Sequence, residues 1–136
     1  MAEAYFNMMA KKHGCRWHAV SGGTCALNGN PASSSAVSLM AEYSASLENF
    51  RSSSISVGTL MDSELVICME TAHCKALSEF YPPAAGKIHL LSHWLAGSGC
   101  DTDINWLSDS YDFHRSCFEI MKPALDNLFE YVNQIK

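Results

Sequence analysis

The spacing of hydrophobic residues changes from helical to strand-like and back to helical in the first third of the chain. Met1, Tyr5, Met8 and Met9 fall at helical spacing, which predicts a helix over Ala2–His13 that stops at Gly14. The run "CRWHAVSGG" at 15–23 alternates in polarity and ends in two glycines, which predicts a strand. The turn-rich stretch that follows leads to a second helical pattern at 34–45, preceded by serines that can act as N-caps.

The second half of the chain repeats the alternation with stronger signals. A polar loop and a short helical turn at 50–62 precede "ELVICM" at 64–69, a continuous apolar run typical of a strand buried on both faces. Residues 70–83 predict a helix capped by Thr71, and 86–94 predict another buried strand. The stretch 95–110 predicts a long loop. The last 26 residues predict a long helix that Pro123 kinks, with one apolar face formed by Phe118, Met121, Leu125, Leu128 and Val132.

Strands that alternate with helices predict an α/β fold with three layers, in which a parallel sheet carries helices on both faces. The 136 residues suit one domain, 1–136. Two features of this pattern are unusual. It contains three convincing strands, which is few for such a fold, and it begins with a helix, although a crossover helix normally lies between two strands.

Composition narrows the classes of partner and compartment. The net charge of −5, with nine Lys and Arg, argues against a basic surface for nucleic acid or anionic membrane, and no stretch is long and apolar enough to span a membrane. The six cysteines come without a secretory signal, and several lie in apolar runs. We therefore expect a reduced, cytoplasmic protein.

A cysteine nucleophile for phosphate chemistry needs an arginine six positions later, with backbone N–H groups between them that bind the phosphate. The residues six positions after the six cysteines are Ser21, Pro31, Cys74, Phe80, Trp106 and Pro123. None is arginine, so this motif is absent from the chain.

Metal and nucleotide sites are also weakly supported. Cys68, His73 and Cys74 lie close in sequence, as do His89 and His93, but neither set has a zinc spacing. The loop 101–112 places acidic residues at EF-hand-like intervals, but Trp106 stands where the tight turn needs glycine. "SGGTCALNGNP" fits no phosphate-binding glycine motif, and no GxSxG supports a serine hydrolase. We expect no metal and no cofactor.

Taken together, several stretches resemble the low-molecular-weight protein tyrosine phosphatase family in order and spacing. They are "MAEAYF", "VSGGT", "GNPASSSAVSLMAE", "DSELVICMETAHCKALSEFYP", "GKIHLLSHW" and "YDFHRSCFEIMKPALDNLFEYV". The resemblance runs over nearly the whole chain, and "MAEA" and "ELVICME…H…L" are its most specific parts. Arsenate reductases share this fold, so the resemblance does not separate the two substrates.

The resemblance implies which catalytic parts to look for. In the family, "MAEA" follows a strand and a CxxxxxR loop that supplies the nucleophile and the phosphate-binding arginine; that strand lies in the middle of a sheet ordered 2-1-3-4. The family's general acid is an Asp followed by Pro before the last helix. No Asp-Pro occurs in this chain, and the acid's position falls on Asn105 or Trp106. Asp103 and Asp109 are candidate substitute acids.

We therefore expect a phosphatase-like protein that lacks the first, central strand and is catalytically inactive in this form. Two alternatives remain: a truncated form of an active phosphatase for phosphotyrosine or another phosphoamino acid, and a non-catalytic interaction module. Without the central strand, the predicted strands at Arg16–Val20 and Glu64–Met69 must pair directly or leave backbone unpaired. We expect the chain to relieve this exposure as a homodimer or a strand-exchanged oligomer, or to be less stable than its relatives.

Overall fold

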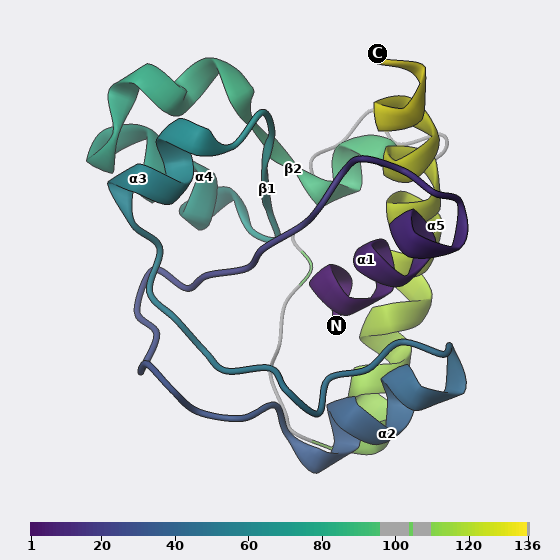
Figure 1. Cartoon of the computed structure of the whole chain (residues 1–136). Helices are drawn as coiled ribbons and strands as arrows, with labels where there is room; N and C mark the ends of the chain where they lie inside the picture. The colour runs from purple at the N-terminus through teal and green to yellow at the C-terminus, as the bar shows by residue number, and fades with distance from the viewer. Residues whose placement is uncertain (96–103, 105–109, 136) are drawn as a thin grey trace.

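The computed structural model describes residues 1–95, 104 and 110–135, and within them it has an α/β architecture (Figure 1). Helices α1 (Ala2–Lys12), α2 (Ser34–Glu42) and α5 (Tyr111–Gln134) form one side of the molecule. The other side contains α3 (Val57–Asp62), α4 (Thr71–Phe80), the 3₁₀ helix η1 (Pro82–Lys87) and strands β1 (Val66–Cys68) and β2 (Ile88–Leu90). A second 3₁₀ helix, η2 (Leu91–Trp94), follows β2 and contacts α5.

The larger core forms where α1 and α2 pack on α5. All five residues of the predicted apolar face of α5 are buried, and Phe118 is fully so. The ring of Phe118 meets the edges of Tyr5 and Tyr43, with ring centres 5.3 and 4.7 Å away. The sequence pattern of α5 was therefore sufficient to identify the side of the helix that faces the core.

On α1 the most buried positions are Tyr5, Phe6 and Ala10, whereas Met1, Met8 and Met9 of the predicted stripe are only partly buried against this core. The helix ends where predicted. Gly14 has φ of +61°, a left-handed conformation that favours glycine after a helix C-terminus.

The sheet is parallel and small. β1 pairs with β2 in the register Val66↔Ile88, and this is the two-stranded sheet of the described residues. The side chains of β1 and its neighbours alternate between two cores, as a strand covered on both faces requires. Ile67 packs against the helical core, while Cys68 belongs to a smaller core with Leu60, Leu77 and Leu90.

The strand predicted at 15–23 is the main correction. Within the described residues, the stretch 16–22 is assigned to no strand and makes no backbone–backbone hydrogen bond. The next residue, Gly23, forms an isolated parallel bridge with Ser54. Alternating polarity predicted an extended chain, but a strand also needs a neighbouring strand with which to pair.

Local capping was predicted with mixed success. Ser33 caps α2 by accepting a hydrogen bond from the Ala36 N–H. Thr71, in contrast, is the first helical residue of α4, and Glu70 occupies the N-cap position without a side-chain cap bond. The strand predicted over 86–94 is confined to β2, because the chain turns into η2 at Leu91.

Pro123 lies inside the continuous α5, and the predicted kink there stays a prediction. Among the described residues, no helix combines the length and apolarity needed to cross a membrane.

Candidate functional site: a groove between two extended segments

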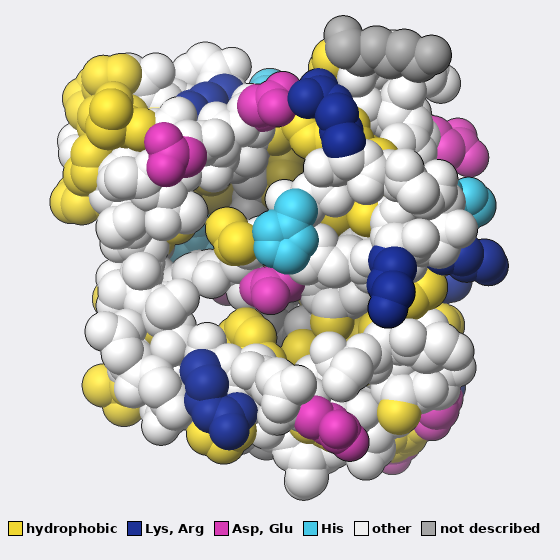
Figure 2. All heavy atoms as spheres, in the orientation of Figure 1, with side chains coloured by type: hydrophobic (Ala, Val, Ile, Leu, Met, Phe, Trp, Pro, Cys, Tyr) yellow, Lys and Arg dark blue, Asp and Glu magenta, His cyan; other side chains and the backbone are white. Residues whose placement is uncertain are grey.

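A large groove opens in the middle of the molecule, between its two sides. Its volume is about 1050 Å³, and Figure 2 shows it as a deep hollow with hydrophobic side chains inside. Pockets for small ligands commonly measure about 300–1,000 Å³, so this groove lies at or beyond the upper end of that range.

The two long walls of the groove are both extended backbone. One wall is the stretch 16–22, and the other is β1 with its flanking residues, 64–69; every residue of both stretches lines the groove. The walls meet at their starts, where Arg16 and Glu64 form an ion pair with an N–O distance of 3.9 Å. Because Arg16 begins one wall and Glu64 begins the other, both walls start at the same end of the groove.

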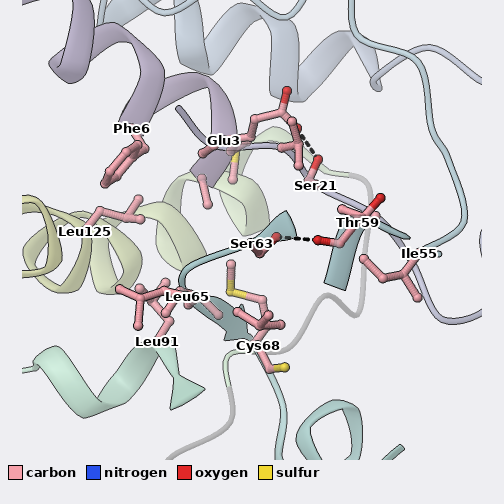
Figure 3. A pocket seen from close by; sticks show the side chains of 18 of the residues that line it. Glu3, Phe6, Ser21, Ile55, Thr59, Ser63, Leu65, Cys68, Leu91 and Leu125 are labelled. Carbon is pink, nitrogen blue, oxygen red and sulfur yellow. Dashed lines mark hydrogen bonds between the residues drawn. The ribbon is translucent and has the colours of Figure 1, made fainter. Parts of the chain in front are cut away.

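The wall 16–22 is held in place by α1. The side-chain amide of Asn7 donates to the Ala19 carbonyl and accepts from the Ala19 N–H, with both donor–acceptor distances 2.8 Å. The Ser21 hydroxyl donates to the Glu3 carboxylate (Figure 3). The Asn7 side chain thus occupies the N–H and the carbonyl of Ala19, which a neighbouring strand could otherwise bind.

The interior of the groove is apolar on two faces. Figure 3 shows Phe6 of α1 and Leu125 of α5 on one side and Ile55 on the other, with Leu65 and Cys68 along the β1 wall. Leu91 of η2 also lines the groove, beside Leu65. A chain segment inside the groove would therefore meet hydrophobic side chains both above and below its backbone.

The carboxyl ends of the two walls each contact another part of the chain. The Ile104 N–H donates to the Met69 carbonyl at 2.8 Å, and Ile104 is buried in the helical core. At the corresponding end of the other wall, Ser21 contacts the first turn of α1 through Glu3. Ligand sites of parallel α/β sheets lie beyond the carboxyl ends of the strands, so this end of the groove is where such a site is expected.

The described cysteines do not form a nucleophilic centre. Burial raises the pKa of Cys68 to about 12, and the adjacent Cys74 thiol adds to the shift. Burial also raises the pKa of Cys117 on α5. Both thiols are therefore held in the protonated form, which is a poor nucleophile.

Cys15 is the described cysteine nearest the start of the chain, and it lies just past the C-terminal end of α1. Its thiol donates to the Asn133 side-chain oxygen at 2.8 Å, and its backbone N–H is bonded to the Ala10 carbonyl. An anion is bound by free N–H groups at a helix N-terminus, whereas the end of α1 beside Cys15 presents carbonyls.

The predicted acid positions lie elsewhere. Asp103, Asn105, Trp106 and Asp109 fall outside the described residues, as does most of the acidic loop 101–112. Within the described residues, no group of three or more His, Cys, Asp and Glu side chains is arranged to hold a metal.

Motif spacing in the sequence did not reveal the groove. The sequence signal that pointed to it was architectural: the pattern contained three convincing strands, where a fuller sheet is usual. That signal predicted unpaired backbone but gave neither the size nor the apolar lining of the space.

Comparison with known proteins agrees with this architecture. The family model described as "Low molecular weight phosphotyrosine protein phosphatase" matches residues 1–136. The low molecular weight protein-tyrosine-phosphatase Wzb of Escherichia coli K12 is 36% identical over 106 residues, which cover 78% of this chain and 67% of that protein. Wzb of Salmonella typhimurium is 31% identical over 106 residues, covering 78% of this chain and 66% of that protein.

The fold also matches a solved structure of this family. The low molecular weight protein tyrosine phosphatase from T. tengcongensis superposes with a TM-score of 0.84 and 30% identity, over 96% of this chain and 88% of that one. The sequence matches span about two thirds of the length of the Wzb relatives. The order of the elements, the parallel β1–β2 pair and these matches together show that the chain belongs to the low molecular weight phosphotyrosine protein phosphatase family.

Proposed function

We propose that the 136-residue chain is a phosphatase-family scaffold that does not hydrolyse phosphate esters by itself. The observation that carries this proposal is the state of its cysteines. No cysteine in the sequence is followed six positions later by arginine, and the buried Cys68 and Cys117 have raised pKa values. A thiolate attack on phosphorus needs an ionised sulfur beside an anion-binding loop. No described cysteine combines these two features.

The second half of the reaction is also unsupported by the residues present. A general acid must protonate the leaving oxygen, and the Asp-Pro pair of the family does not occur in this sequence. Asn105 and Trp106, at the family's acid position, carry no carboxyl group. Asp103 and Asp109 remain candidate substitutes, and a cytoplasmic location remains part of the proposal.

The test is a turnover assay of the purified chain with p-nitrophenyl phosphate, with Escherichia coli Wzb as the positive control. We expect release of p-nitrophenol at the rate of buffer alone. Turnover within tenfold of the control, abolished by vanadate and by Cys15→Ser or Cys25→Ser, would overturn the proposal. Cys15 lies just past the C-terminal end of α1, and Cys25 is exposed to solvent.

A second candidate function is supported by the carboxyl end of the groove. Met69 and Ser21 lie at the ends of the two walls, and Glu3 of the first turn of α1 lines the groove with them; a parallel α/β fold places its ligand site beyond such strand ends. In this case the chain is part of a working phosphatase for phosphotyrosine or another phosphoamino acid, whose nucleophile and arginine come from residues beyond these 136.

In-frame codons for a strand and a CxxxxxR loop before Met1, and turnover by the extended chain, would favour this candidate. Loss of that turnover in Asp103→Asn or Asp109→Asn would identify the substitute acid.

A further inference from the structure

We propose that His89 and His93 form a binding site for one divalent transition-metal ion of the kind that prefers imidazole ligands, such as Ni²⁺ or Zn²⁺. The site lies where β2 turns into η2, and neither histidine lines the groove. The inference goes beyond the proposed function and does not depend on it. It rests on the turn after β2, the separation of the two rings and the contacts that surround them.

The direction of the His89 side chain follows from the alternation of side chains along β2. Ile88 and Leu90 belong to the smaller core, so His89 between them faces the other side of the sheet. Its register partner on β1 is Ile67, which packs against the helical core. The His89 imidazole is therefore directed towards the helical side of the molecule, where η2 contacts α5 (Figure 1).

The turn at the end of β2 brings His93 back to His89. In a continued strand, two residues four positions apart would be separated by about 13 Å. The chain forms η2 instead, and the ring centres of His89 and His93 are 6.1 Å apart, with the ring planes inclined by 34°. The strand predicted over 86–94 and the lack of a zinc spacing led to the expectation of no metal, and the proposal departs from that expectation because of this turn.

The separation of the two rings fits a shared metal ion. A metal–nitrogen bond of about 2.1 Å, with about 1.1 Å from the nitrogen to the ring centre, places the ion about 3.2 Å from each ring centre. Two rings on one ion therefore lie from about 4.5 Å apart, at a right angle, to about 6.4 Å apart, in line. The observed 6.1 Å lies within this range, and the exposed His93 side chain can rotate to shorten it.

The surroundings hold the pair through ring contacts. Trp94 lies edge-on to both imidazoles, with its ring centre 5.9 Å from His89 and 5.1 Å from His93. Trp94 is itself held against α5, because Asn127 donates to its carbonyl at 2.7 Å and its ring packs beside Tyr131. Within the described residues, the contacts of the two imidazoles are with rings, and neither makes a hydrogen bond or an ion pair. Their nitrogens are therefore available to a metal ion, for which neutral imidazole is a common ligand.

The ligand type sets the class of metal. Imidazole nitrogen suits Zn, Cu and Ni, whereas Mg²⁺ and Ca²⁺ prefer oxygen ligands. Within the described residues, no further His, Cys, Asp or Glu side chain completes a set of three with this pair. Water fills the other coordination positions. Two imidazoles held together still bind more tightly than one, because the second bond forms within the same molecule.

The test is a titration of the whole 136-residue chain, kept reduced, with Ni²⁺. Calorimetry gives the affinity and the stoichiometry, and the paramagnetic ion broadens the NMR signals of nearby amides. The variants are His93→Ala, at an exposed position, and His89→Gln, which keeps a polar side chain on β2. The matched control is His13→Ala, because His13 is also exposed and lies beside an aromatic ring, Phe129, at 5.5 Å. Circular dichroism verifies that each variant is folded.

We expect one Ni²⁺ per chain, with broadening centred on β2 and η2. His93→Ala and His89→Gln should each weaken binding by at least about tenfold, since each leaves a single imidazole, and His13→Ala should leave the affinity unchanged. Full binding in the folded His93→Ala variant would overturn the proposal, as would equal weakening in His13→Ala. Absence of binding at about 1 mM Ni²⁺ would also overturn it.

Two other ways of binding metal give different results. Cys68 and Cys74 lie together in the smaller core, and Ni²⁺ held by their thiolates would broaden β1 and α4 and would remain bound in His93→Ala. One ion per two chains, in a sample that sediments as a dimer, would mean that the homodimer expected from the sequence supplies ligands from both copies. Either result would overturn a two-histidine site within one chain. The turnover assay is run without added metal, so this proposal and the proposed function fail separately.

Discussion

The helical side and the sheet side of the molecule differ in how far they are complete. Among the described residues, α1, α2 and α5 enclose a core of seventeen buried residues on the helical side, whereas the smaller core beside β1, β2, α3 and α4 has four. A helix satisfies its backbone hydrogen bonds internally and needs only apolar contacts from its neighbours. A strand can bond its N–H and C=O groups only to neighbouring chain, and among the described residues β1 pairs on one edge, with β2.

The two sides contact each other through β1, whose side chains enter both cores, and through η2, which packs on α5. This arrangement predicts that the helical side controls global unfolding, while the sheet side opens separately at lower free energy. Substitutions on each side, and one across the groove, can break or sharpen that difference.

The largest effect is expected for Phe118→Ala, in the centre of the helical core. It removes a fully buried ring and its contacts with Tyr5 and Tyr43, and we expect a loss of about 3–5 kcal/mol in the free energy of unfolding. Urea denaturation followed by circular dichroism measures the loss. Phe80→Ala, at a position where the ring is 57% exposed, is the matched control and should cost far less. Similar losses in both variants would contradict a dominant helical core.

A smaller loss is expected for Leu60→Ala, in the smaller core. Leu60 is 1% exposed, and its truncation should cost about 2–3 kcal/mol because this core borders the open groove and can partly collapse. Native-state hydrogen exchange should show faster exchange in β1 and α4 and unchanged exchange in α5. The exposed neighbour Met61 gives the control, Met61→Ala. If exchange accelerates equally in α5, the two sides unfold as one unit.

The next largest loss of stability is expected for Tyr5→Phe, which removes a hydrogen bond within the helical side. The Tyr5 hydroxyl donates to the Asp126 carboxylate at 2.6 Å, and its loss should cost about 1–2 kcal/mol at pH 7, measured by urea denaturation. Tyr131→Phe, in which the changed ring is 45% exposed, is the control.

The same hydroxyl also predicts a pH dependence. Burial, with the Asp126 carboxylate adding to it, raises the pKa of Tyr5 above its usual value of about 10. A raised pKa means that the folded protein holds this proton more tightly than the unfolded chain. The stabilisation is therefore complete below about pH 10 and is lost as the pH rises further. In the Tyr5→Phe variant this part of the decline should be absent, and an unchanged decline would assign it to other groups.

The smallest effect is expected for the ion pair that joins the two walls of the groove. The Arg16 and Glu64 side chains are 63% and 61% exposed, so the coupling in a double-mutant cycle of Arg16→Ala and Glu64→Ala should stay below about 0.5 kcal/mol. The Lys122–Asp126 pair on α5, at 2.8 Å and less exposed, is the comparison cycle. A coupling above about 1 kcal/mol for Arg16–Glu64 would mean that the walls are joined more firmly than the geometry indicates.

Helices and their ends were largely determined by the local sequence. The apolar face of α5 follows from spacing alone, and Ser33 and Gly14 stand where a cap and a stop are expected. These features depend on residues at most about four positions apart, so the chain specifies them without knowledge of the fold. Family membership was also visible in the sequence, because the order of its motifs follows the order of its elements.

The sheet was decided by the tertiary structure. The alternating run 15–23 predicted a strand, but the segment 16–22 faces a groove and Asn7 holds its backbone instead. Whether an extended segment becomes a strand depends on a partner that is distant in sequence, and no local pattern contains that information. The sequence by itself thus determined the helices, the cap residues and the family. Only the packing of the helices around β1 decided that the space beside this strand is an apolar groove of strand length.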